Sequence, residues 1–282
     1  MIEVDTNVIS DIRKGFYVPA QPELLIKLQN LMSQEEPELN TIADAISQDV
    51  GVAATILKTI NSPVYGLSRS ISDIKKSVRY IGLNGINSLV TNTLIQRSFE
   101  QDTCSIALSE FWSNATNIAN ACVLIGKYLK QAVCKDTLFS LGLFHDCGIP
   151  VMAMKYKDYD ETFKSSMLEE SDTLTNIEEI SYSVNHATIG YYVATSWRLP
   201  KDICELILAH HDYQYVLSKA NRIQKFYYAI LKLAENIVHI NRYNRDSNDW
   251  IILEKTILTL LDVESQDYKK LIETVSEHHL TH

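Results

Sequence analysis

The chain has few of the residues that interrupt helices, with nine glycines and six prolines among 282 residues. Glycine and proline are the strongest local breakers of regular structure, so their scarcity leaves long windows open for helices. No convincing run of alternating apolar and polar residues, the pattern typical of a half-buried strand, interrupts these windows. We therefore expect an almost entirely α-helical protein.

Cysteine is also sparse and scattered. None of the five cysteines belongs to a CxxC pair, which excludes a zinc ribbon, and their spacing shows no disulfide framework. The N-terminus has no basic segment followed by an apolar one, and no apolar run approaches the roughly 18 to 20 residues that a membrane span needs. These absences predict a cytoplasmic protein with reduced thiols and no membrane segment.

An excess of basic residues is missing as well, since the formal net charge is -9. A protein of that charge repels the phosphate backbone of nucleic acid and the surface of an anionic membrane. We therefore expect neither nucleic acid nor membrane among its partners. The 46% hydrophobic and 22% charged residues are typical of a globular protein, which excludes disorder for most of the chain.

Apolar residues recur at helical spacing along most of the sequence. The expected helices lie near residues 21–34, 39–49, 51–61, 74–81, 86–99, 107–130, 136–145, 201–211, 221–241, 250–261 and 265–278. The stretch 156–195 should hold two helices, separated by a polar break at residues 169–176. Asn61, Ser62 and Pro63 should form a turn, in which Asn61 bonds backbone groups that the end of the helix leaves unpaired.

Histidine and aspartate gather in the second half of the chain. His145 and Asp146 stand in a Phe-His-Asp-Cys-Gly segment, His186 follows an asparagine within a helical pattern, and His210 and His211 end another helix. Imidazole and carboxylate suit iron, manganese or zinc, and a helical bundle can direct such side chains from several helices to one point. Each histidine alone is more often structural, so only the set indicates a metal site.

His210 and His211 are neighbours in the sequence, and neighbours on a helix point about 100° apart. We therefore expect one of the pair to face away from the site. His210 is favoured as the inward member, because Leu206 and Ile207 lie on its face of the helix.

The first half of the chain contains a second set of recognisable segments. They are Val18-Pro19-Ala20-Gln21-Pro22, Ile46-Ser47-Gln48-Asp49-Val50, Ile60-Asn61-Ser62-Pro63-Val64-Tyr65-Gly66 and Tyr80-Ile81-Gly82-Leu83. Over about residues 16–240 the sequence resembles the HDOD domain, a bacterial relative of the HD and HD-GYP metal-dependent phosphohydrolases. The resemblance implies an all-α fold, an HD-domain-like helical bundle with an N-terminal helical cap lobe, and a role at the output end of bacterial signalling. The pattern changes near residue 100, so we expect residues 1–100 to form the N-terminal lobe and 101–282 the HD-like bundle with the C-terminal helices.

The resemblance also implies a ligand set and exposes departures from it. The implied metal ligands are His145, Asp146, His186, His210, His211 and Glu235, with Asp146 as the catalytic residue if the protein is active. Asn114 stands where catalytic relatives have a histidine, and a neutral amide is a poorer ligand for a transition metal than imidazole. Ile149 replaces a lysine that is common in active relatives, and Glu235 stands in the place of an aspartate. No Gly-Tyr-Pro element is present, which disfavours the cyclic-di-GMP phosphodiesterase class.

Two functions stay open at this point. The favoured one is a non-catalytic signalling module that binds a protein partner or a small ligand and receives its signal from a separate molecule. The alternative is a phosphohydrolase that acts on a nucleotide or another phosphoester through a water bound to a divalent metal, with iron, manganese or zinc as the cofactor. Because of Asn114 and Ile149, we expect hydrolysis to be absent or very weak.

Overall fold

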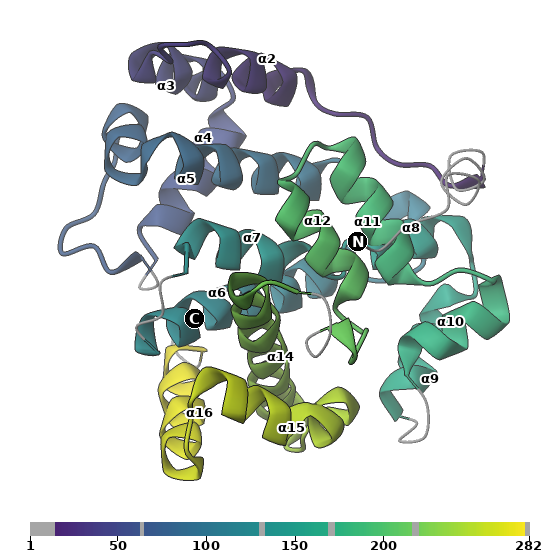
Figure 1. The fold of residues 1–282 in the computed structure, drawn as a ribbon. Helices are drawn as coiled ribbons and strands as arrows, with labels where there is room; N and C mark the ends of the chain where they lie inside the picture. The colour runs from purple at the N-terminus through teal and green to yellow at the C-terminus, as the bar shows by residue number, and fades with distance from the viewer. Residues whose placement is uncertain (1–14, 63–64, 130–132, 169–172, 216–219, 280–282) are drawn as a thin grey trace. The chain divides into compact units, whose positions relative to one another are not determined.

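The structure is a computed structural model that describes residues 15–62, 65–129, 133–168, 173–215 and 220–279. These residues contain no β-strand, and the predicted all-α fold is confirmed (Figure 1). The chain forms two compact units, Pro19–Phe99 and Glu100–His282, and the described residues 15–18 belong with the second. The predicted domain division stays a prediction, because contacts within one chain do not show which segment folds independently.

Among the described residues of the first unit there are four α-helices: α2 (Glu23–Met32), α3 (Leu39–Ser47), α4 (Val50–Ile60) and α5 (Ile74–Arg97). Helix α5 packs against the other three. Leu28, Ile46, Ile56 and Val90 are fully buried between these helices, and each such side chain stabilises the fold by about 1.5 to 3 kcal/mol. The periodicity of the sequence therefore identified the helices of this unit to within a few residues.

Helix α5 differs from the expectation of two separate helices. Asp73 caps its start by accepting a hydrogen bond from the backbone N–H of Lys76 at 2.9 Å. At Gly82 the backbone leaves the helical region, with φ 81° and ψ 175°, and helical geometry then resumes. Glycine adopts a positive φ without steric cost. The break was predicted correctly, but no loop separates the two halves.

Asn61 holds the turn after α4, as the sequence predicted. Its side-chain amide donates hydrogen bonds to the backbone oxygens of Leu57 and Ile71, at 2.8 and 2.7 Å. Its side-chain oxygen accepts the backbone N–H of Ile71 at 2.7 Å. The side chain of Asn61 thus joins the end of α4 to the loop residue Ile71, in the segment that leads into α5.

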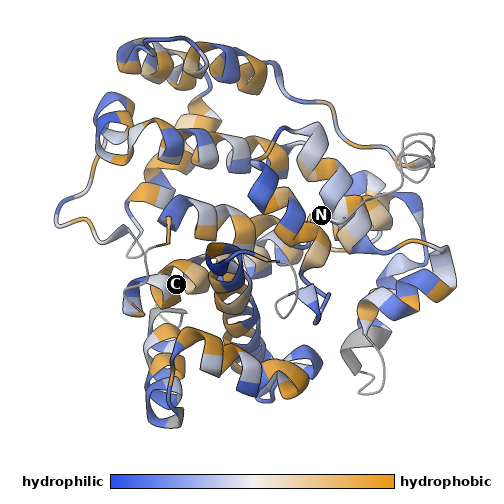
Figure 2. Ribbon diagram, in the orientation of Figure 1, coloured by the Kyte–Doolittle hydropathy of each residue, from blue (hydrophilic) through white to orange (hydrophobic). Residues whose placement is uncertain are grey.

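The second unit contains the remaining helices. They are α6 (Leu108–Tyr128), α7 (Lys135–Phe144), α8 (Gly148–Lys155), α9 (Tyr159–Leu168), α10 (Leu174–Tyr182), α11 (His186–Ser196), α12 (Lys201–Ala209), α14 (Arg222–Tyr243), α15 (Asn248–Leu261) and α16 (Ser265–His279), with a short 3-10 helix η2 (Gln101–Thr103). Helix α6 packs on α7, α14 and α16, and α11 packs on α8 and α12. Hydrophilic residues lie beside hydrophobic ones along these helices, as in amphipathic helices that bury one side (Figure 2).

Residues 148–196 were only partly predicted. Helix α8 was not predicted, and residues 156–195, which were expected to hold two helices, contain α9, α10 and α11. The additional break follows α10, where Ser183 adopts a left-handed conformation with φ 58°. Asn185 then caps α11 by accepting the backbone N–H of Thr188 at 2.9 Å. Pro150 is compatible with α8 because it lies in the first turn, where a helix leaves its backbone N–H groups unpaired anyway.

Helices α8 and α11 meet through their backbones. A Cβ atom on Gly148 would lie 2.0 Å from the backbone oxygen of His186 and 2.6 Å from the backbone nitrogen of Gly190. No other residue fits at position 148 unless one of the helices shifts. This contact fixes the distance between the turn that carries Asp146 and the helix that begins at His186.

One stretch of the described chain, Lys135–Lys155, is long and apolar enough to cross a membrane by length and composition alone. The expectation that no run approaches this length was wrong for these residues. They form α7 and α8, and 83% of the apolar window is buried inside the protein. Helices that are covered on all sides lack a polar stripe, so core helices and membrane helices resemble each other in sequence.

Candidate metal centre

Asp146 lies at the centre of the histidine cluster, in the turn between α7 and α8. Its Oδ1 atom lies 3.2 Å from Nε2 of His210 and 3.3 Å from Nε2 of His186. Its Oδ2 atom lies 3.0 Å from Nε2 of His145. One oxygen of the Asp146 carboxylate therefore faces two imidazoles, and the other oxygen faces a third.

Three further histidines of the cluster lie at helix ends, His186 at the start of α11 and His210 and His211 directly after α12. His186 is the first residue of α11 and not an interior residue, because Asn185 is the cap. His210 follows the last residue of α12, Ala209. His211 also joins the cluster, with its Nε2 atom 3.1 Å from Nε2 of His186. The expectation that one of His210 and His211 faces away was wrong, because the helix ends at Ala209 and the 100° rule does not apply beyond it.

One ligand atom from each of four residues, Asp146, His186, His210 and His211, lies within 4.8 Å of all the others. The Nε2 atoms of His186 and His210 are 3.4 Å apart. Two imidazole nitrogens that bind one ion at about 2.0 to 2.1 Å in tetrahedral geometry are separated by about 3.3 Å. The donor set and its spacing are compatible with a divalent metal ion.

The other ring nitrogen of every histidine in the cluster is held by an oxygen. Nδ1 of His145 donates to the carbonyl of Gly142 at 2.9 Å, and Nδ1 of His210 donates to the carbonyl of Ile207 at 2.6 Å. Nδ1 of His186 lies 2.7 Å from Glu178, and Nδ1 of His211 lies 3.1 Å from Asp249. Because these acceptors hold a proton on Nδ1, the Nε2 atom of each neutral ring faces inward with a free electron pair.

Burial and charge set the protonation of the cluster. Burial, followed by the neighbouring His211, lowers the pKa of His210 to about 3. Burial and then the Lys232 charge lower the pKa of His211 to about 4. Burial would also lower the pKa of His186, but Glu178 and Asp146 outweigh it and raise this pKa to about 10. His210 and His211 are therefore neutral at pH 7, whereas a metal ion must displace a proton from His186.

Glu178 was missed in the sequence analysis. It is fully buried, and its Oε2 atom accepts both Nδ1–H and the backbone N–H of His186, at 2.7 and 2.9 Å. Its other oxygen accepts a short hydrogen bond from the hydroxyl of Tyr159. The segment Ile177-Glu178-Glu179 gives no signal that distinguishes the buried glutamate from its exposed neighbour.

Lys232 and Asp249 were missed as well. Lys232 is 2% exposed on α14, and its Nζ atom lies 2.8 Å from Glu235 and 2.9 Å from Asp249. Asp249 also accepts a hydrogen bond from the hydroxyl of Tyr213 at 2.7 Å. The lysine had a usable signal, since it is the one charged residue in the apolar run from Phe226 to Ala234. Glu235 lies beside His145, with 3.3 Å between Oε1 and Nε2, and outside the group of four.

A cavity of about 1030 Å³ opens beside the cluster. His145, Asp146, His186, His211 and Glu235 form part of its wall. The same cavity is lined by the basic residues Lys164, Arg242 and Arg245 and by the buried side chain of Ile149. A volume of this size accommodates a ligand as large as a nucleotide.

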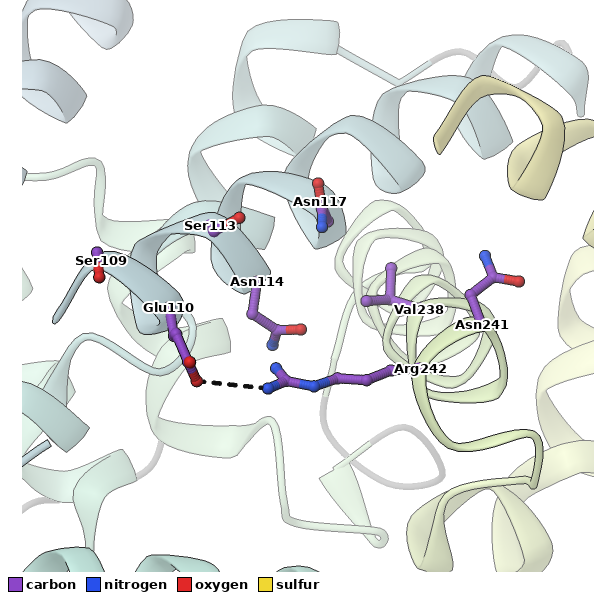
Figure 3. Close-up of a pocket in the computed structure, with 8 residues that line it drawn as sticks. All are labelled: Ser109, Glu110, Ser113, Asn114, Asn117, Val238, Asn241 and Arg242. Carbon is purple, nitrogen blue, oxygen red and sulfur yellow. Dashed lines mark ion pairs between the residues drawn. The ribbon is translucent and has the colours of Figure 1, made fainter. Parts of the chain in front are cut away.

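Asn114 lies on the wall of this cavity and of a second hollow of about 550 Å³. Figure 3 shows the second hollow between α6, which contributes Asn114 and Glu110, and α14, which contributes Arg242. Glu110 and Arg242 form an ion pair of 3.5 Å across it. The position where catalytic relatives carry a histidine thus holds an amide that the structure records in no hydrogen bond with the cluster.

The sequence profile of the HDOD domain matches residues 18–213. An "Uncharacterized protein" from Treponema pallidum (strain Nichols) is 26% identical over 196 residues, which is 69% of this chain and 38% of that protein. The chain therefore spans well under half the length of this relative.

Solved structures with the same fold are more divergent in sequence. A "Putative phosphohydrolase" from Shewanella amazonensis SB2B has a TM-score of 0.72 at 17% identity, over 97% of this chain and 94% of the other. An "HDOD domain protein with unknown function" from Geobacter sulfurreducens has a TM-score of 0.66 at 20% identity, over 96% and 97%. A "Putative signal transduction protein" from Marinobacter aquaeolei VT8 has a TM-score of 0.68 at 13% identity, over 99% and 61%. At these identities the likeness shows the fold alone.

Proposed function

Since this chain belongs to the HDOD family, we propose that it is a signalling module that binds a divalent metal ion and, in the adjacent cavity, a small anionic ligand. The observation that supports this proposal most strongly is the group of Asp146, His186, His210 and His211, whose ligand atoms lie within 4.8 Å of one another. Iron, manganese and zinc all accept imidazole and carboxylate together. The proposal takes binding as the main activity and turnover as absent or very weak.

The metal ion would be held by those four side chains and would supply a positive charge that attracts an anionic oxygen atom of the ligand. The same cavity is lined by Lys164, Arg242 and Arg245, of which Lys164 pairs with Asp160 at 2.6 Å and Arg242 pairs with Glu110 at 3.5 Å. Guanidinium groups present paired N–H donors that suit phosphate or carboxylate.

A second candidate function is hydrolysis of a phosphoester, and the placement of Asp146 between the imidazoles favours it. Efficient hydrolysis requires a well-held ion and positive charge that balances the phosphoryl oxygens. Asn114 provides no imidazole, and Ile149 places an apolar side chain on the cavity wall. The signalling proposal therefore comes first.

The test is metal analysis of protein purified without added metal or chelator, followed by loading with Mn²⁺, Fe²⁺ or Zn²⁺. We expect bound metal in the wild type and at least a tenfold weaker affinity in His186→Gln and in Asp146→Asn. Asp160→Asn, at a half-buried carboxylate on α9 that pairs with Lys164 and lies outside the group of four, is the matched control and should retain the metal. Folded wild-type protein that binds no metal would refute the proposal. Hydrolysis of a phosphodiester at an enzyme-like rate, lost in Asp146→Asn, would favour the second function.

A further inference from the structure

Lys232 is a charged side chain in the middle of the protein core. It projects from the apolar helix α14 and is 2% exposed. Its Nζ atom lies 2.8 Å from Oε2 of Glu235 and 2.9 Å from Oδ2 of Asp249. A buried ammonium group is costly unless carboxylates surround it, and Lys232 has two. Its position between these carboxylates is therefore a specific feature of this centre.

Glu235 connects Lys232 to one side of the histidine cluster. Its Oε2 atom pairs with Lys232, and its Oε1 atom lies 3.3 Å from Nε2 of His145. His145 in turn faces Oδ2 of Asp146 at 3.0 Å. The other oxygen of Asp146, Oδ1, faces His186 and His210. The centre thus has a four-residue side around Oδ1 and a second side, made of His145 and Glu235, around Oδ2.

We propose that the Lys232 ammonium group replaces a second metal ion at the side of His145 and Glu235, so that the centre holds one ion. This inference rests on the proposed function, because it assumes that the four-residue side binds metal. The ammonium already neutralises Glu235, which is the carboxylate that a second ion would need. A second cation near Glu235 would also be repelled by Lys232 across a buried site where charges are poorly screened.

Asn114 also disfavours a second metal ion. It lines the cavity with His145 and Asp146, and its neutral amide is a weaker transition-metal ligand than imidazole. The side of His145 and Glu235 therefore lacks one strong ligand, because Asn114 replaces a histidine, and the Lys232 ammonium group lies beside another ligand, Glu235. The four-residue side keeps all four of its ligands, and Lys232 faces it across Asp249, a carboxylate that holds both the ammonium group and the imidazole of His211.

Mn²⁺ stoichiometry tests the inference directly. Metal analysis after gel filtration should give one ion per wild-type chain, and electron paramagnetic resonance should show an isolated ion without coupling to a second. Asn114→His alone should still bind one ion, because Lys232 remains. Asn114→His combined with Lys232→Met should bind two, and Mn²⁺ should raise its melting temperature more than that of the wild type.

The matched control for the double variant is Asn114→His with Lys232→Arg, which keeps the positive charge and should bind one ion. Two ions in the wild type or in Asn114→His would overturn the inference and leave the proposed function standing. A folded double variant with Lys232→Met that still binds one ion would also overturn it. No bound ion in the wild type would overturn the proposed function itself. If the Lys232→Met variant does not fold, the stoichiometries of the wild type and of Asn114→His still decide.

Discussion

Glu178 shows how a single buried carboxylate can control the histidine cluster. Both of its contacts with His186 orient the imidazole so that Nε2 faces Asp146. Such indirect partners of a metal ligand typically change metal affinity by about 10- to 100-fold when they are removed. Glu178 is therefore a positioning residue, and its role can be separated from that of the ligands.

We predict that Glu178→Gln weakens metal binding by about 10- to 100-fold, because the glutamine does not hold the Nδ1 proton of His186 as strongly. Competition with a chelator dye measures the affinity. Glu179→Gln is the matched control, since Glu179 is exposed and its amide replacement can still accept the hydrogen bond from Asn185. Equal affinities in the two variants would contradict the positioning role.

The lowered pKa values of His210 and His211 predict a pH dependence of stability. Their pKa values of about 3 and 4 lie below the ordinary histidine value of 6.5. Between pH 6.5 and 4 the unfolded chain therefore binds protons that the folded chain does not, so stability falls as the pH falls. Each histidine contributes up to about 1.4 kcal/mol per pH unit in that window. His186, whose pKa is raised to about 10, is protonated in both states there and adds nothing to this slope.

Urea unfolding of the metal-free protein at pH 6 and at pH 5 measures this effect. We expect a smaller pH dependence in His211→Asn, where the asparagine amide can still donate to Asp249 but does not titrate. A free energy of unfolding that is the same at both pH values in the wild type would show that these imidazoles are protonated in the folded state.

At the scale of elements, the turn after α4 depends on one side chain. Asn61→Ala removes two bonds to the backbone of Ile71 and one to that of Leu57, so we predict a loss of about 1 to 2 kcal/mol in the free energy of unfolding. Chemical denaturation measures it, with Asn30→Ala on the exposed side of α2 as the control. If Asn61→Ala kept its full stability and lost the binding of a partner, the turn would be a functional surface instead.

The helices themselves were largely predictable, and the exceptions have local causes. The break at Gly82 follows from backbone chemistry that the sequence shows directly. The break after α10 was missed because its left-handed residue is Ser183, which has no strong preference for that conformation. His211 was assigned to the wrong face because the last residue of α12 was placed two positions too late, at residue 211, and helix ends are the least certain part of such a prediction.

At the scale of the whole molecule, the proposed ligands come from three segments that are far apart in sequence. They became visible only as a set, since each histidine alone is more often structural. Asp249 stayed hidden because it looks ordinary until α14 packs against α15. Lys232 was overlooked although it is the one charged residue in the apolar run from Phe226 to Ala234. The sequence therefore indicated the candidate ligands, and packing decides which charged side chains surround them.

An ion that binds only the folded protein should stabilise it as a whole. We predict that chelation of metal from the loaded protein lowers its melting temperature, by an amount that corresponds to about 2.7 kcal/mol when the free metal was present at 100 times its dissociation constant. Differential scanning calorimetry measures this difference. Asp146→Asn should respond to neither metal nor chelator, and an equal response in that variant would place the ion elsewhere.

Gly148 has a consequence for motion. Because Gly148 has no side chain, the backbones of α8 and α11 approach each other closely at this residue. This contact holds Asp146 and His186 at a fixed separation. His210 and His211 follow the end of α12, where no close glycine contact of this kind is found among the described residues. Amide protons in the first turns of α8 and α11 should exchange slowly with or without metal, whereas those around residues 209–213 should speed up when metal is removed. A conformational change caused by metal binding at the centre would then begin at the C-terminal end of α12.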